Sequence, residues 1–212
     1  MLRPVNFYLN AIFGDGTISK YYSNGKAQCN FSNTNEEIIR FKAKMINSKY
    51  YKRQQSEKAY GKKPIYVTQK SLPIIDMPKI ELIRRIGLED FFLWLCDDGS
   101  IHKRSGFMNL CSHSLSLAEN IELSWHLWHY LGIETRVLPE RKKDERVFFY
   151  QYIPRAQVES YIPEMEKWLY ENELTSLLYK IGKVYRLDEN RRAKQSEAGD
   201  TRNSEDIVNS HK

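Results

Sequence analysis

Two apolar runs, one near the start of the chain and one near its middle, end at the same kind of sequence. Residues 8–13 lead into Asp15-Gly16-Thr17-Ile18, and residues 91–96 lead into Asp98-Gly99-Ser100-Ile101, 83 positions further on. An apolar run that stops at Asp-Gly is typical of a helix that ends in a turn. The pattern therefore predicts the same junction, from helix to strand, twice in one chain.

The segments after the two junctions also match in order. Each junction leads into a short polar strand, a turn and a second strand, and then into a helix that begins at cap-like residues. Two further strand-like stretches and a closing helical run complete each half. The expected second strands are 28–33 and 108–113, the later strands 49–55, 64–70, 133–138 and 146–153, and the closing helices 79–86 and 163–181.

The repeating unit is thus helix-ββ-helix-ββ-helix, used twice. It predicts an α+β fold in which each half has a four-stranded antiparallel sheet, with helices on one face and the other face free. We place the first repeat at residues 1–86 and the second at residues 87–187. Residues 188–212 hold five Lys/Arg and six Asp/Glu, with Ile207 and Val208 as the only strongly apolar residues, so we expect a disordered polar tail there.

The charge of the chain indicates the kind of partner that it binds. The chain has 33 Lys+Arg and 27 Asp+Glu among its 212 residues, which gives a formal net charge of +6. The surplus is uneven, because residues 38–70 hold ten basic residues and one acidic residue. A basic surface of this kind favours a polyanionic partner such as a nucleic acid.

Other features exclude several classes of protein. The longest apolar run, residues 91–96, is far below the roughly 18–20 residues that span a membrane, and the first residues show no signal-peptide pattern. The three cysteines form no CxxC pair, which argues against a disulfide framework and against a cysteine zinc site. We therefore expect an intracellular protein with no membrane partner.

The repeated Asp-Gly is the main candidate for chemistry. A single Asp-Gly after a helix is most often just a turn, but two copies in matching contexts indicate more. Packing the two helices side by side would bring Asp15 and Asp98 to one end of a pseudo-twofold axis. Two neighbouring carboxylates repel each other unless they share a proton or bind cations, and hard divalent ions such as Mg2+ take oxygen ligands.

The residues around the second junction resemble a known family. Trp94-Leu95-Cys96-Asp97-Asp98-Gly99-Ser100 is similar to Trp-Phe-Met-Asp-Asp-Gly-Ser, the second motif in one branch of the LAGLIDADG homing endonucleases. Residues 110–116 resemble the strand end that leads into the next helix of this family, and residues 176–180 resemble the Ser-Met-x-Tyr-Lys of the branch. The resemblance covers about residues 6–182 and implies two pseudo-symmetric LAGLIDADG-type repeats that form a saddle over DNA.

The resemblance also implies roles for individual residues. It makes Asp15 and Asp98 the catalytic acids that bind Mg2+ or Mn2+. It places the neighbouring Gly14 and Asp97 at the metal site, with Asp97 as a cap or a contact to water. The remaining catalytic positions are polar residues at strand ends and basic residues near the end of each repeat: Asn33, His113, Lys180 and, for the first repeat, Lys79 or Lys70.

A sheet face with alternating polar and basic side chains can lie along a major groove and reach phosphates and base edges. The set that faces DNA depends on strand register, because a slip of one residue reverses it. The candidates by alternation and position are Lys20, Tyr22, Gln28, Asn30, Lys52, Gln54, Gln69, His102, Arg136, Lys142 and Arg146.

The sequence thus favours a monomeric, metal-dependent endonuclease that cuts double-stranded DNA at a long, imperfectly palindromic site. By resemblance, it would cut across the minor groove and leave short 3′ overhangs. One alternative is a group I intron RNA maturase on the same scaffold, which binds intron RNA and need not cut. A second alternative is a transcription regulator, which would need an appended helix-turn-helix domain that residues 188–212 are too short and polar to supply.

Overall fold

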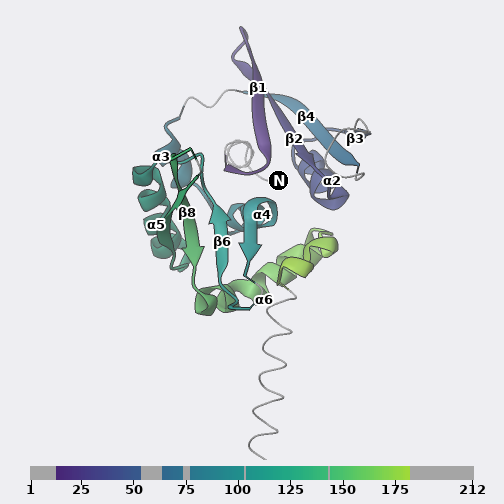
Figure 1. The fold of residues 1–212 in the computed structure, drawn as a ribbon. Coiled ribbons are helices and arrows are strands. Elements are labelled where there is room, and N and C mark those ends of the chain that lie inside the picture. Colours follow the sequence, from purple (N-terminus) through teal and green to yellow (C-terminus); the bar gives the residue numbers. More distant parts are fainter. Residues whose placement is uncertain (1–12, 54–63, 74–76, 103, 143, 182–212) are drawn as a thin grey trace, which may run out of the picture.

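The computed structural model describes residues 13–53, 64–73, 77–102, 104–142 and 144–181 (Figure 1). Gln54, most of the first predicted helix and the whole predicted tail lie outside the described residues. Among the described residues, no helix is both long and apolar enough to cross a membrane. We call the described residues up to 86 the first half of the protein and those from 87 onward the second half.

The described part of the chain forms two four-stranded antiparallel sheets with the same strand order, β1-β2-β4-β3 and β5-β6-β8-β7. This confirms the α+β class and the two sheets that the repeated pattern predicts. The first half contains β1 (Gly16–Tyr22), β2 (Lys26–Asn33), α2 (Glu36–Met45), β3 (Tyr50–Arg53), β4 (Ile65–Pro73) and α3 (Lys79–Ile83). The second half contains α4 (Leu88–Asp98), β5 (Gly99–Ile101), β6 (Met108–Cys111), α5 (Leu117–Leu131), β7 (Arg136–Arg141), β8 (Val147–Ile153), α6 (Arg155–Glu171) and the 3-10 turn η1 (Thr175–Leu177).

Local signals fix where the corresponding helices α2 and α5 begin. The side chain of Asn35 accepts hydrogen bonds from the backbone amides of Glu37 and Ile38, so it caps α2. Ser116 and Glu119 form a reciprocal capping box at the start of α5. Because each cap marks the start of its helix, a residue of α2 corresponds to the residue of α5 that stands equally far after its own cap.

The closing helix differs from its predicted span. The sequence predicts residues 163–181, whereas α6 begins eight residues earlier and ends at Glu171, with Pro163 inside it. Buried residues on both sides of the proline, such as Val158 and Met165, keep one face of the helix packed on the core, and this offsets the missing backbone hydrogen bond. The chain turns at Glu173, whose φ of 58° lies in the left-handed region.

One hydrophobic core joins the two halves. In β2 and β6 the side chains at alternating positions, such as Phe31 and Leu110, are fully buried, and the residues between them face the open side of each sheet. Residues 91–96 of α4 are all buried, and Figure 1 shows this helix between the two sheets. The helix that carries the second Asp-Gly junction is therefore the central element of the fold.

Candidate functional site

The two Asp-Gly junctions contact each other in the folded protein. Asp15 stands directly before β1, and Asp98 is the last residue of α4, directly before β5. The backbone N–H of Asp15 donates to Oδ2 of Asp97 at 3.4 Å, and the rings of Phe13 and Trp94 stack with their centroids 5.3 Å apart. Segments 83 residues apart in the sequence are thus neighbours, as the pattern predicts.

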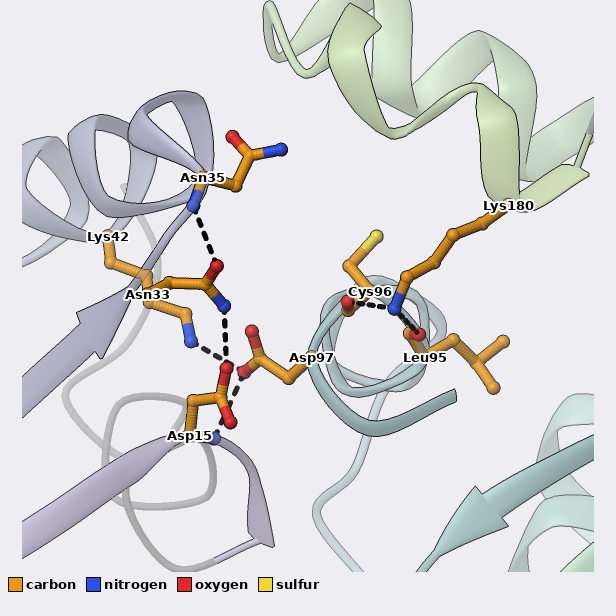
Figure 2. Close-up of polar contacts among 8 residues, drawn as sticks. All are labelled: Asp15, Asn33, Asn35, Lys42, Leu95, Cys96, Asp97 and Lys180. Atoms are coloured by element: carbon orange, nitrogen blue, oxygen red, sulfur yellow. Dashed lines mark hydrogen bonds and ion pairs between the residues drawn. The ribbon is translucent and has the colours of Figure 1, made fainter. Parts of the chain in front are cut away.

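A strand-end amide holds the carboxylate of Asp15. The Nδ2 group of Asn33, at the end of β2, donates to Oδ2 of Asp15 at 2.6 Å (Figure 2). The Oδ1 atom of Asn33 accepts from the backbone N–H of Asn35 at 2.9 Å. Because this second bond fixes which way the amide points, Asn33 presents a donor to Asp15.

The carboxylate of Asp98 lies in a different environment. Within the described part of the chain, its side chain has no hydrogen bond or ion pair. The pKa of Asp98 is raised to about 6, first by burial and then by the negative charges of Asp15 and Asp97, against the opposing charges of Lys42 and Lys180. This carboxylate is therefore held close to other negative charge, the situation that a bound cation would relieve.

Asp98 also lines an open hollow of about 320 Å³ on the free face of the second sheet. The hollow is bordered by Cys111, His113 and Glu140. Nε2 of His113 lies 2.9 Å from Oε2 of Glu140. His113 thus shares a hollow with Asp98, while its ring is paired with a neighbouring acid.

The two predicted strand-end residues do not occupy equivalent positions. Gly16 pairs with Phe31, and Gly99 pairs with Leu110. Asn33 stands two residues after Phe31, at the end of β2, but His113 stands three residues after Leu110, in the turn that follows β6. From the residue that pairs with the glycine to the cap of the next helix, the chain is two residues longer in the second half (Leu110 to Ser116) than in the first (Phe31 to Asn35). The sequence alone does not reveal this difference.

The residue that does match Asn33 in register is Ser112. Its side chain is buried and donates to Oδ1 of Asn120 at 2.5 Å. The two halves therefore present different groups beside their acidic residues.

All three predicted lysines contact backbone carbonyls. Nζ of Lys180 donates to the carbonyl oxygens of Leu95 at 3.1 Å, Gly99 at 3.2 Å and Cys96. It thereby adds a donor to carbonyls at the C-terminal end of α4, where the carbonyl of Leu95 also accepts from the backbone N–H of Gly99. Burial lowers the pKa of Lys180. Lys79 donates to the carbonyl of Ser114 at 2.7 Å, and Lys70 donates to the carbonyls of Ile46 at 2.5 Å and Asn47 at 2.9 Å.

A buried ion pair that the sequence analysis missed lies beside the site. Nζ of Lys42 in α2 is 2.5 Å from Oδ2 of Asp97 in α4, and these side chains are 1% and 0% exposed. Asp97 therefore differs from the expected cap or water contact, because the first half of the protein covers its carboxylate. A signal was present in the sequence: Lys42 lies on the apolar stripe of its helix, with Ile38 and Ile39.

The chemistry of the two acids bears on the expected divalent metal. Among the described residues, no group of three or more His, Cys, Asp and Glu side chains is arranged to hold a metal ion. Asp15 and Asp98 offer only oxygen donors, the type that Mg2+ and Mn2+ prefer. Because such ions keep several waters and bind substrate phosphates, two carboxylates are a sufficient protein contribution. The residues therefore fit this kind of ion.

In the first sheet, several predicted DNA-facing residues form one polar row on the open face. Nε2 of Gln28 donates to Oε1 of Gln69 at 3.1 Å and to Oδ1 of Asn30 at 3.4 Å, and the hydroxyl of Tyr22 donates to Oε1 of Gln28. In the backbone pairing of β1 with β2, Lys20 stands opposite Gln28. Lys52 does not share that face: it pairs with Tyr66 and so points to the side of the helices.

In the second sheet, the predicted residues all stand at open-face positions. Arg136 pairs with Tyr152, which pairs with Asn109, and Lys142 faces Arg146 across the β7–β8 turn. This face also carries a set of aromatic residues that the sequence did not predict there. Phe107 stacks on His102 with ring centroids 4.7 Å apart, and the open face also carries Phe148, Tyr150 and Tyr152.

The described elements form two ββ-helix-ββ units, with an Asp-Gly junction from each brought together. This is the LAGLIDADG fold, which one solved homing endonuclease shares. No protein-family model and no curated protein matches the sequence.

The homing endonuclease I-WcaI, solved bound to its DNA recognition sequence, is similar with a TM-score of 0.56 and 17% identity, over 79% of this chain and 86% of that one. I-DmoI in complex with DNA and Mn has a TM-score of 0.42 and 15% identity, over 74% of this chain and 94% of that one. The N-terminal LAGLIDADG domain of DUF199/WhiA has a TM-score of 0.48 and 11% identity, over 76% and 79%. The likeness to I-WcaI shows the fold.

Proposed function

We propose that this protein is a divalent-metal-dependent endonuclease that cuts both strands of a long, imperfectly palindromic DNA site. The observation that carries the proposal is the meeting of the two junctions: the backbone of Asp15 contacts the last turn of α4, the helix that ends at Asp98, and the charge of Asp15 acts on Asp98. A protein that only binds nucleic acid has no need of two such acids. Their mutual repulsion is an electrostatic cost that metal binding would offset.

The two sheets supply the DNA-binding surface in this proposal. The open face of the first sheet carries an amide row centred on Gln28, and that of the second carries Arg136 among aromatic rings. Amides read base edges and arginines reach phosphates or guanine, so the two unlike faces would read unlike half-sites. I-WcaI, the solved structure that shows this fold, is bound to its DNA recognition sequence.

Asp15 and Asp98 would hold the metal in this proposal. A bound divalent ion would lower the pKa of a water molecule and stabilise the leaving oxygen. Asn33 orients the carboxylate of Asp15 through its 2.6 Å hydrogen bond. Lys180 holds the C-terminal end of α4, where Asp98 is the last residue. His113 would accept a proton or position water within the hollow that it shares with Asp98.

The experiment is cleavage of a randomised double-stranded DNA library with Mg2+ by the native chain and by Asp15→Asn and Asp98→Asn. The expected result is cut ends that share one long motif, lost in both variants while DNA binding survives. Binding to nucleic acid with no cutting by the native chain would overturn the proposal. In that case intron RNA would be the next ligand to test, because the maturase alternative uses the same scaffold.

A further inference from the structure

The buried ion pair between Lys42 and Asp97 crosses from one half of the protein to the other. Lys42 comes from α2 of the first half and Asp97 from the last turn of α4. Figure 2 shows Lys42 and Asn33 approaching from the side of α2 and Asp97 from α4, with Asp15 below the point where they meet. The pair is therefore located where the two junctions touch.

One oxygen of this pair also holds Asp15. Oδ2 of Asp97 accepts from Nζ of Lys42 at 2.5 Å and from the backbone N–H of Asp15 at 3.4 Å. The carboxylate of Asp15 is held separately by Asn33. Asp15 is thus fixed at its backbone by the second half of the protein and at its side chain by the first.

The pair has no counterpart on the other side of the pseudo-twofold axis. Lys42 lies seven residues after the cap of its helix, Asn35, and the residue seven after Ser116 in α5 is Leu123, which is fully buried. The residue that corresponds to Asp97 before the first junction is Gly14. Both members of the pair are therefore replaced together by uncharged residues, and the backbone near Asp98 is held by Lys180 instead.

A buried ion pair is a poor way to gain stability. The desolvation of both charges opposes their attraction, and apolar replacements are often no less stable. Moreover, Oδ1 of Asp97 is buried without a hydrogen-bond partner among the described residues, which adds to the desolvation penalty. A pair with this geometry is better explained by the position that it imposes on its neighbour.

We propose that Lys42 and Asp97 are positioning residues that hold Asp15 in place, through a hydrogen-bond contact that the pair makes to Asp15 and not to Asp98. The inference rests on the proposed endonuclease function. Because Asp98 has no such pair, loss of the pair should slow cleavage of one DNA strand more than the other. General destabilisation would slow both strands equally.

The first test uses Lys42→Met on a DNA target labelled at each 5′ end in turn. The expected result is a nicked intermediate with one strand cut about tenfold more slowly than the other, as for loss of a hydrogen bond to a charged group. Ile39→Ala is the matched control, because Ile39 is buried in the same helix and contributes no polar contact to the site. Equal slowing of both strands in Lys42→Met would overturn the inference.

The second test does not depend on cleavage. Hydrogen exchange of the Asp15 amide, followed by NMR, should be about tenfold faster in Lys42→Met than in the native protein, with the amides of β4 unchanged. An unchanged rate at Asp15 would overturn the inference even if the native chain cuts DNA. If the native chain cuts no DNA, the proposed function is wrong. The exchange rate of the Asp15 amide would then still show whether Lys42 and Asp97 hold Asp15 in place.

A double variant keeps the inference testable if Lys42→Met does not fold. Lys42→Met with Asp97→Asn removes both charges but keeps an oxygen that can accept from the Asp15 amide. We expect it to fold and to restore most of the slow exchange and most of the balance between strands. If the double variant is as unbalanced as Lys42→Met, the positioning role of Asp97 is wrong.

Discussion

Asn33 donates a hydrogen bond of 2.6 Å to the carboxylate of Asp15, which ties the end of β2 to the start of β1. The bond restricts the rotation of a proposed metal-binding group. Its donor is itself oriented by the backbone of Asn35. The position of Asp15 therefore depends on a short chain of contacts from the cap of α2.

Replacing Asn33 by leucine should remove the hydrogen bond while keeping a side chain of similar size. We expect kcat to fall by about tenfold, because a mispositioned group costs rate rather than binding. DNA affinity measured with Ca2+ in place of Mg2+ should stay within about twofold. Asn172→Leu is the control, because the side chain of Asn172 also donates a hydrogen bond, to the carbonyl of Trp168, but lies at the end of α6. A loss of affinity with unchanged kcat would contradict this role for Asn33.

The raised pKa of Asp98 predicts a pH dependence. A carboxylate binds a cation only when it is ionised, so metal binding should be full above pH 6 and should weaken as the pH falls through about 6. A 13C NMR titration of the metal-free protein should give Asp98 a midpoint near 6. In Asp15→Asn the midpoint should move to lower pH, because one of the negative charges that raise it is gone. An unmoved midpoint would mean that the two acids do not interact.

Lys180→Met should destabilise the protein. It removes the charged donor that the carbonyls of Leu95 and Gly99 share at the buried end of α4, for an expected loss of about 1–3 kcal/mol in the free energy of unfolding. Denaturation by urea measures this loss. Lys79→Met removes a comparable contact at a more exposed place and should cost about 0.5 kcal/mol. Equal losses in the two variants would contradict the special position of Lys180.

Arg136→Gln should weaken DNA binding through loss of a phosphate or guanine contact. If Arg136 meets a phosphate, the slope of log affinity against log salt should become less steep by about 1. Fluorescence anisotropy at several salt concentrations measures the slope. Arg84→Gln is the control, because Arg84 pairs with Glu122 on the helical side of the protein. A similar change in both variants would indicate a non-specific charge effect.

The fold was predictable because its signals are local and repeated. The Asp-Gly junctions, the cap-like Asn35 and Ser116 and the alternating strands each follow from a few neighbouring residues, and the structure has the elements in that order. The closing helix begins eight residues before its predicted start at Pro163, because packing on both sides of the proline continues the helix.

The finer parts of the site depend on contacts between distant residues. Asn33 and His113 match in sequence but not in register, since the pairing of Gly16 and Gly99 sets the register and only the sheets reveal it. Lys42 and Asp97, which form the ion pair, are 55 residues apart in the sequence. A lysine on an apolar stripe signals a buried partner, but the partner's identity comes from the packing of α2 against α4.

The one-sided ion pair also determines which halves can associate. If the chain were divided after residue 86, two copies of the second half would bring two Asp97 carboxylates together with Leu123 where Lys42 should be, and two copies of the first half would bury Lys42 against Gly14. Only the unlike combination pairs the charges, and an unpaired buried charge is a strong penalty against the wrong partner. The contact that fixes Asp15 therefore favours association of a first half with a second half over association of two identical halves. If the two halves were made as separate chains, they would form one kind of dimer.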